Sequence, residues 1–357
     1  MTDAAPIPQE REAITAEWLT TVLSSSGQDL EVAQIEILDQ HSGTTGRVRV
    51  GLTYAAGDDG PASVFVKLPP FDESQRGLVA ATGMGRREAR FYAGPATDVP
   101  MRIPRAYHAA HGAEPTEYVM VLEDLEASGC RFPKGLDPEA PDHVDQLMAG
   151  FARLHARFWN DPAFEGSGEL SWLEPSMRGP FGAMLIDSAR TQFAAELGPT
   201  FDALCALFVE HHERIVDIWD EGEQTLIHGD PHGGNQFLDG DTLGLYDWAV
   251  ISKSPGIRDV AIYLGNSCPA ELRREGQQRW IAAYRQGLVD AGVADAPTEA
   301  VLFERYRRVV LYAWVAAATT AAMGDKWQPL EVGMAGMRRA TTACEDLDTL
   351  GALRDAL

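Results

Sequence analysis

Three side chains that could together bind a metal and accept a proton lie in one segment of the sequence, residues 226–250, which reads LIHGDPHGGNQFLDGDTLGLYDWAV. Asp230 is followed by Asn235 and then by Asp247. Amide and carboxylate oxygens suit Mg²⁺, which takes one or two protein ligands and completes its shell with water and substrate phosphates. Asp230 stands in a loop just before this metal position, where a carboxylate can accept the proton of a hydroxyl group. The pattern indicates metal-assisted chemistry at a hydroxyl.

A hairpin would bring the two metal candidates together. The runs QFL and LGLY are short and apolar, and Asp-Gly-Asp-Thr between them is a typical turn. With the turn centred near Asp241, Gln236 pairs with Tyr246, and Asn235 falls opposite Asp247. Directly opposed residues have Cα atoms roughly 4.5–5.5 Å apart. We therefore predict that Asn235 and Asp247 are metal ligands at the base of a hairpin.

The composition limits the classes of protein and of partner. A chain of 357 residues fits two domains or one bilobal unit, and 45% hydrophobic with 23% charged residues is typical of a globular protein. The 30 basic and 53 acidic residues give a net charge of −23. Such a surface repels phosphate backbones and anionic lipids, so we expect no nucleic acid partner and no membrane partner.

The first residues of the sequence, its longest uncharged stretch and its cysteines together predict a cytoplasmic location. The first residues, MTDAAPIPQEREAI, carry acids and prolines where an export signal needs a basic and then an apolar region. The longest uncharged stretch, residues 309–324, is shorter than the roughly 20 residues that span a bilayer. The four cysteines show no metal-ligand spacing, which favours reduced, inert thiols. We expect a monomer or a weak homodimer.

The first third of the chain has the texture of a β-rich lobe. Apolar residues at helical spacing predict a helix over residues 14–23. From Ile35 onward, short alternating segments broken by glycine predict hairpins, with a further helix around residues 86–92.

Beyond Asp142 the chain reads as mostly helical. Apolar residues recur at intervals of three and four over residues 144–158, 201–219 and 302–323, and the only clear strands here are QFL and LGLY. The expected fold is α+β and bilobal, with a β-rich N-terminal lobe over residues 1–122, a helical lobe over residues 123–357 and a hinge at about residues 122–126.

The spacing of Asp230, Asn235 and Asp247 resembles the catalytic loop of the kinase superfamily, where a base and a metal-binding Asn precede a second metal-binding Asp. HGD stands in place of the HRD of protein kinases, and Asp247-Trp248 stands in place of DFG. These departures resemble the aminoglycoside phosphotransferase and choline kinase-like branch, which phosphorylates small molecules. The resemblance implies that PGIRDVAIYL, residues 255–264, contains a residue, Asp259, that braces the catalytic loop.

The first lobe extends the resemblance. SGTTG, with Gly43, Thr44, Thr45 and Gly46, looks like a glycine-rich loop whose backbone N–H groups approach phosphate. The resemblance implies that Lys67, in SVFVKLPP, holds the α- and β-phosphates of ATP.

Two further assignments follow from the same resemblance. It implies that Glu88 positions the Lys67 ammonium. The segment VMVLEDL is similar to the hinge of ecdysteroid kinase-like proteins, which places the adenine edge at the backbone of Leu122, Glu123 and Asp124.

The sequence thus predicts an enzyme that transfers the γ-phosphoryl group of ATP, with Mg²⁺, to a hydroxyl of a small molecule. A nucleotide-binding pseudokinase or scaffold, and a protein Ser/Thr kinase, are the alternatives. The complete set of Lys67, Asp230, Asn235 and Asp247 disfavours the first, and the absence of an APE element and a long activation segment disfavours the second. An aminoglycoside, a choline-like amine, a sterol-type alcohol and a sugar all stay open as acceptors.

Two histidines of the loop have other expected roles. His228 is expected to bond the backbone of the loop. His232 is expected either to be an oriented structural residue or to touch the acceptor or phosphate.

Overall fold

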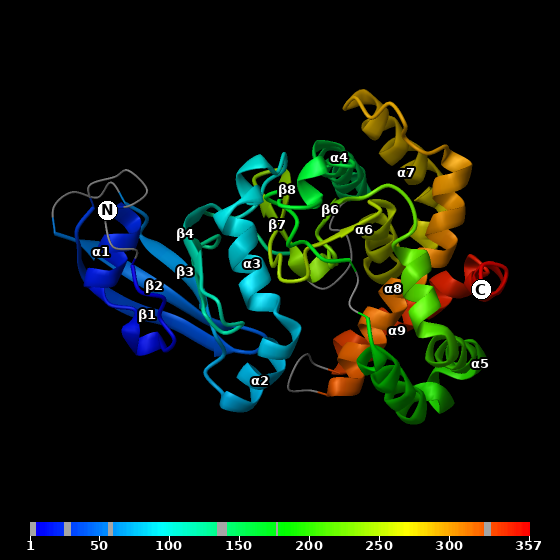
Figure 1. Ribbon diagram of the computed structural model, residues 1–357, viewed down its shortest axis with the longest axis horizontal. Coiled ribbons are helices and arrows are strands. Elements are labelled where there is room, and N and C mark those ends of the chain that lie inside the picture. The colour runs from blue at the N-terminus through cyan, green and yellow to red at the C-terminus, as the bar shows by residue number, and fades with distance from the viewer. Residues whose placement is uncertain (1–4, 25–29, 56–59, 134–140, 176–177, 325–329) are drawn as a thin grey trace. The chain divides into compact units, whose positions relative to one another are not determined.

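The computed structural model describes residues 5–24, 30–55, 60–133, 141–175, 178–324 and 330–357. The chain forms two compact units (Figure 1). The first contains residues 1–131 and 237–250, and the second contains residues 132–236 and 251–357. The expected lobe boundary at residues 122–126 falls inside the first unit, which also contains most of the predicted hairpin.

The first unit is built on a five-stranded antiparallel sheet with the strand order β1-β2-β3-β5-β4. Its strands are β1 (Val32–Ser42), β2 (Gly46–Tyr54), β3 (Ser63–Leu68), β4 (Ala106–His111) and β5 (Tyr118–Glu123). Its helices are η1 (Arg11–Ala13), α1 (Ala16–Ser24), α2 (Glu73–Thr82), α3 (Met84–Ala93) and η2 (Pro95–Asp98). The predicted helices at residues 14–23 and 86–92 are thus confirmed as α1 and α3.

Alternation along the strands assigns the two faces of this sheet. The apolar face, which includes Val48 and Val50 of β2 and Val64 and Val66 of β3, packs against Trp18 and its neighbours on α1. Since successive side chains of a strand point to opposite faces, the residues between these valines face away from α1. Arg47 and Lys67 are therefore on the same face, directly opposite each other in the β2–β3 register.

The predicted hairpin is present as β7 (Gln236–Asp239) and β8 (Thr242–Leu245), which pair in a two-stranded sheet. Its predicted register is wrong, because β8 ends at Leu245, so that Tyr246, the predicted partner of Gln236, and Asp247 lie beyond the strand. The turn falls at Gly240 and Asp241, with Gly240 at a positive φ of 58°. The hairpin is tied to the rest of the first unit by backbone bonds, in which Arg131 N–H donates to Leu238 and Leu245 N–H donates to Arg102.

The second unit is mainly helical. Its helices are α4 (Pro141–Arg157), η3 (Pro162–Phe164), α5 (Pro180–Trp219), η4 (Gly233–Asn235), α6 (Ile257–Ile262), the π-helical turn η5 (Tyr263–Ser267), α7 (Ala270–Asp290), α8 (Glu299–Met323), α9 (Leu330–Asp346) and α10 (Thr349–Arg354). The predicted helix at residues 201–219 is the second part of α5, which is interrupted at Gly198 and His211. Pro199 and the positive φ of Gly198 account for the first of these breaks.

The second unit also contains two strands that the sequence reading missed. β6 (Thr225–Ile227) pairs antiparallel with β9 (Ser252–Ser254) on either side of the catalytic-loop sequence. Each strand has three residues, which is too short for an alternating pattern to be visible. The predicted α+β fold is confirmed, with β structure dominating the N-terminal region and helix the C-terminal region. Among the residues described, no helix is long and apolar enough to cross a membrane.

Candidate active site

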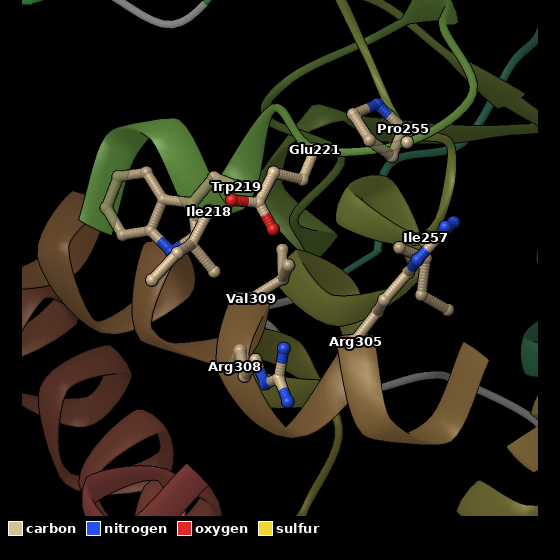
Figure 2. A pocket seen from close by; sticks show the side chains of 9 residues that line it. Ile218, Trp219, Glu221, Pro255, Ile257, Arg305, Arg308 and Val309 are labelled. Carbon is tan, nitrogen blue, oxygen red and sulfur yellow. The ribbon is translucent and has the colours of Figure 1, made fainter. Parts of the chain in front are cut away.

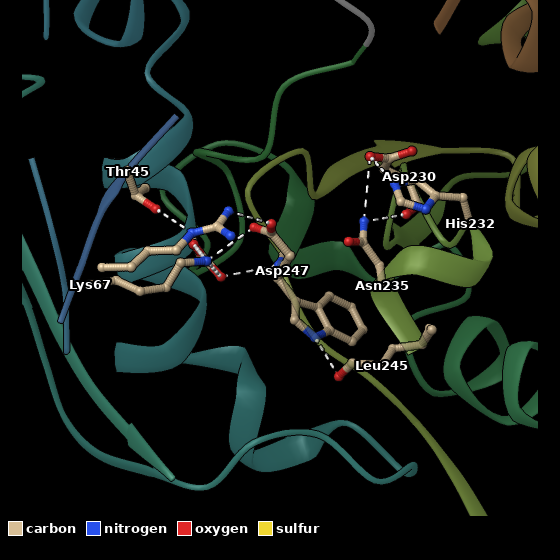
Figure 3. A network of polar contacts seen from close by, with 10 residues as sticks. Thr45, Lys67, Asp230, His232, Asn235, Leu245 and Asp247 are labelled. Atoms are coloured by element: carbon tan, nitrogen blue, oxygen red, sulfur yellow. Dashed lines mark hydrogen bonds and ion pairs between the residues drawn. The ribbon is translucent and has the colours of Figure 1, made fainter. Parts of the chain in front are cut away.

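The first unit brings together three of the predicted site residues (Figure 3). Lys67 Nζ on β3 donates to both carboxylate oxygens of Glu88 on α3, at 2.7 and 2.6 Å, and to Asp247 Oδ1 at 3.0 Å. Lys67 and Glu88 are buried, with side-chain exposures of 5% and 0%, whereas Asp247 is 21% exposed. The predicted pairing of Lys67 with Glu88 is present. The carboxylate of Asp247, which is predicted to bind metal, also contacts Lys67.

Burial sets the electrostatics of this cluster. Transfer from water raises the pKa of Glu88, while the Lys67 ammonium opposes that rise and Asp247 adds to it. Removing one partner of such a pair would leave an uncompensated buried charge, which is strongly destabilising. Lys67 and Glu88 therefore form a fixed pair, and Asp247 is the more accessible partner.

The segment of Asp247 and Trp248 is locked onto α3. The Trp248 backbone N–H donates to Glu88 Oε1 at 3.2 Å, and its buried ring stacks on Phe91 with centroids 4.4 Å apart. Asp247 itself has a positive φ of 63°, which is uncommon for a residue other than glycine. Such backbone strain persists where the surroundings impose it and is concentrated at functional sites.

The second unit positions the predicted base. Asn235, at the end of η4, donates its side-chain N–H to the Asp230 carbonyl at 2.8 Å and lies 3.4 Å from Asp230 Oδ2 (Figure 3). His232 Nδ1 accepts from the Gly234 N–H at 2.9 Å, and its Nε2 lies 3.5 Å from Asp230 Oδ2. His232 is thus an oriented residue that also faces the Asp230 carboxylate.

A buried carboxylate braces this loop, as the resemblance implied. Asp259 on α6 accepts from the backbone N–H groups of His228 and Gly229 at 2.8 and 2.9 Å. Its Oδ2 also lies 3.3 Å from His155 Nε2, and His155 Nδ1 contacts the Tyr284 hydroxyl at 2.9 Å.

His228 has the backbone role that was expected for it. Its Nδ1 accepts from the Asp230 N–H at 3.2 Å. Together with the two bonds that Asp259 accepts, this bond fixes the backbone from His228 to Asp230, so the predicted base is held by a buried network.

The SGTTG segment forms the turn between β1 and β2. The Gly43 N–H donates to the Thr45 carbonyl at 3.1 Å, which commits that amide within the loop. Thr44 lies at the tip, and Thr45 is buried. A Cβ at Gly46 would lie 2.6 Å from the Pro69 carbonyl, so the loop is packed too closely there for a side chain. The predicted contact of this loop with phosphate stays a prediction.

The side chains of the predicted hinge have structural partners. Leu122 is buried within the sheet, between Phe65 and Ala106. The Glu123 N–H donates to the Arg105 carbonyl at 2.8 Å, and its carboxylate accepts from Arg102.

The Asp124 carboxylate accepts from Ser63 and Arg49. Burial opposes ionisation of Asp124, but these hydrogen bonds outweigh it and hold the pKa of Asp124 below its usual value. The Glu123 amide is used by the sheet, and the Asp124 carbonyl accepts from the Ser128 N–H at 3.0 Å. The predicted adenine contact of the hinge stays a prediction.

The two residues predicted to bind metal each have the donor chemistry that Mg²⁺ prefers. Asp247 supplies carboxylate oxygens, and the Asn235 N–H₂ group is bound by Asp230, which leaves its amide oxygen without a hydrogen-bond partner among the described residues. Within the described parts of the chain, no cluster of three or more His, Cys, Asp or Glu is arranged to hold a metal. An ion bound by Asn235 and Asp247 would take its other ligands from water and phosphate, as Mg²⁺ does in kinases. Their facing arrangement stays a prediction.

One cationic residue of the site was missed from the sequence. Arg47 Nη2 lies 3.3 Å from Asp247 Oδ2, and its Nε lies 3.4 Å from Thr45 Oγ1. The alternation of basic and apolar residues in RVRV could have revealed it, because this alternation places Arg47 on the face of the sheet opposite Val48.

A separate cavity of about 110 Å³ in the second unit lies between α5, α6 and α8 (Figure 2). Trp219, Arg305, Arg308 and Pro255 are among its lining residues, and none of the predicted site residues is.

Among the solved structures with a similar fold are two kinases and an aminoglycoside phosphotransferase. A choline kinase from Cryptosporidium parvum Iowa II has 12% identity and a TM-score of 0.51, over 89% of this chain and 91% of that one. An ethanolamine kinase from Plasmodium vivax has 15% identity and a TM-score of 0.50, over 90% and 83%. The GDP and kanamycin complex of APH(2")-IIia has 13% identity and a TM-score of 0.50, over 92% and 98%. At these identities the similarity shows the fold alone.

Sequence comparison gives the family. None of the curated proteins compared with this sequence is significantly similar to it. The model of the phosphotransferase enzyme family matches residues 50–300. This range covers well over half of the 357 residues and contains Lys67, Glu88, Asp230, Asn235 and Asp247. The chain therefore belongs to the phosphotransferase enzyme family.

Proposed function

We propose that this protein transfers the γ-phosphoryl group of ATP, with Mg²⁺, to a hydroxyl group of a small molecule. The observation that carries the proposal is the contact of Lys67 with both Glu88 and Asp247, which are 21 and 180 residues away in the chain. A buried lysine bound by a helix glutamate beside a metal-binding aspartate is the arrangement that holds nucleotide phosphates in kinases.

Phosphoryl transfer needs positioning and charge stabilisation more than covalent chemistry. Asp230 orients the acceptor hydroxyl and accepts its proton, while Asp259 keeps the loop backbone in place. Lys67 orients the α- and β-phosphates, and Glu88 keeps the ammonium in position. Asn235 and Asp247 are the residues that would hold Mg²⁺, which neutralises charge on the triphosphate when it is bound.

The acceptor is a hydroxylated small molecule of a class still to be identified. The similar structures carry the names of choline, ethanolamine and kanamycin, which all combine hydroxyl groups with cationic nitrogen at neutral pH. The net charge of −23 also favours a cationic acceptor over an anionic one. We expect the acceptor contacts to come from residues 159–223 and from residues after 264.

A screen for ADP release tests the proposal. Purified protein with ATP and Mg²⁺ is assayed against a library of amino alcohols, aminoglycosides, sugars and sterols, beside the Asp230→Asn variant. We expect acceptor-dependent ADP release that the variant lacks. If none of these compounds causes ADP release, a pseudokinase is favoured. If phosphate is transferred only to added proteins, a protein kinase is favoured. Either result contradicts the proposal.

A further inference from the structure

Arg47 and Lys67 form a pair of like charges on the sheet. They are directly opposite in the antiparallel β2–β3 register, so both side chains project from the same face. Like charges in opposed positions destabilise a sheet unless anions offset them. Here Glu88 and Asp247 supply those anions, and the four charges sum to zero.

The two cations are held very differently. Lys67 is 5% exposed and lies 2.6 and 2.7 Å from the Glu88 oxygens, distances typical of strong charge-assisted bonds. Arg47 is 33% exposed, and its contacts with Asp247 and Thr45 are long, at 3.3 and 3.4 Å. Of the two, Arg47 is the one that can exchange its partner at little cost.

The partner of Arg47 is the residue proposed to bind metal. When the Asp247 carboxylate binds a cation, its charge no longer balances Arg47. A guanidinium is planar and presents paired N–H donors that match phosphate oxygens, so a phosphate is a suitable replacement. In kinases the metal lies on the β- and γ-phosphates, which places a group in contact with the metal-binding aspartate close to those phosphates.

On the basis of the proposed function, we infer that Arg47 binds the β- and γ-phosphates of the nucleotide, and that Asp247 is its partner only while nucleotide and metal are absent. Arg49, two residues along the same strand, does not share this role. Its guanidinium is bound by Asp124 and Glu126 and is committed to them.

Calorimetric titration with ATP and with AMP, both with Mg²⁺, tests the role of Arg47. The proteins are the wild type, Arg47→Gln, Arg47→Lys and a control, Arg11→Gln, which removes a half-exposed arginine bound to Glu12 and Gln40. We expect Arg47→Gln to weaken ATP binding roughly tenfold to a hundredfold, since a hydrogen bond to a charged group is lost. AMP binding should change less than about threefold, and Arg11→Gln should match the wild type. Arg47→Lys should have an ATP affinity between those of Arg47→Gln and the wild type, because lysine keeps the charge but not the paired donors.

Three results would overturn the inference, and they differ from one another. Unchanged or tighter ATP binding by Arg47→Gln would mean that Arg47 only neutralises Asp247. An equal loss for AMP and ATP would mean general damage to the unit. Failure of the wild type to bind ATP would overturn the proposed function as well.

Discussion

At the scale of single residues, the catalytic loop depends on one buried carboxylate. Asp259 is fully buried and accepts two backbone N–H groups from the residues that directly precede Asp230. His155 is the third group at this carboxylate, and Tyr284 in turn contacts His155. Under the proposed function Asp259 is a positioning residue, because it would act on the reaction only through the backbone of the loop.

We predict that Asp259→Asn lowers kcat by roughly 10- to 100-fold. The substitution loosens the loop backbone, and a small misplacement of Asp230 is enough to slow the transfer step by this factor. The KM for ATP should change less than about threefold, because Asp259 contacts His228, Gly229 and His155 and none of the residues proposed to hold nucleotide or metal. Steady-state kinetics measure kcat and KM separately, and thermal unfolding checks that the variant is folded. Tyr284→Phe is the matched control, with a smaller loss of kcat. A loss confined to KM would contradict the positioning role.

The sequence revealed those residues whose roles depend on spacing in the chain. Asp230, Asn235 and Asp247 stand in a fixed order, and Lys67 and Glu88 followed from the resemblance that this order suggested. Arg47 was missed because its role depends on its cross-strand neighbour Lys67 and on a contact with Asp247, 200 residues away.

At the scale of elements, the β1–β2 turn contains two glycines with different surroundings. A Cβ on Gly46 would lie 2.6 Å from both the Pro69 carbonyl and the Phe71 ring, whereas the nearest atom to a Cβ on Gly43 is in His41 at 3.6 Å. Gly46 is therefore required by close packing, and Gly43 is not.

We predict that Gly46→Ala destabilises the protein by about 1–3 kcal/mol, since overpacking forces the Pro69 segment to move. Gly43→Ala should stay within about 0.5 kcal/mol of the wild type, which is usual for an open surface position. Urea unfolding of both variants measures the difference. Equal stability of the two alanine variants would show that the Pro69 segment shifts freely.

The sequence also predicted the larger elements better than the smaller ones. Long amphipathic helices such as α8 and the β7–β8 hairpin carry clear periodicity or turn signals. The strands β6 and β9 have three residues each and pair across 25 or more residues of chain, so no local pattern reveals them. They still matter to the site, because they frame the loop that carries Asp230.

At the scale of the whole molecule, the helical unit depends on a buried arginine. Arg273 on α7 is 1% exposed and is bound by Asp346 at the end of α9, which also binds the exposed Arg274. Burial opposes ionisation of Asp346, but the hydrogen bonds from Arg274 and Arg273 outweigh it and lower the pKa of Asp346.

We predict that Asp346→Ala lowers the free energy of unfolding by roughly 2–3 kcal/mol at pH 7, because Arg273 is left without its counter-ion. A carboxylate with a lowered folded-state pKa stabilises the protein above its unfolded pKa of about 3.9, and the effect is lost as pH falls through the lower, folded value. Urea unfolding between pH 7 and pH 3 should show this fall in the wild type and a flatter profile in the variant.

Arg274→Ala is the control, because an exposed ion pair contributes less than about 1 kcal/mol. A pH profile of Asp346→Ala that parallels the wild type would contradict the assignment.

The proposed function gives Asp247 a role in nucleotide and metal binding and Asp230 a role in the transfer step. Calorimetric titration of ATP with Mg²⁺ and with EDTA, on the wild type, Asp247→Ala and Asp230→Ala, separates the two roles. The wild type should bind ATP more tightly with Mg²⁺, Asp247→Ala should lose this dependence, and Asp230→Ala should bind as the wild type does while transferring no phosphate. Unchanged Mg²⁺-dependent affinity in Asp247→Ala, or loss of nucleotide binding in Asp230→Ala, would contradict these roles.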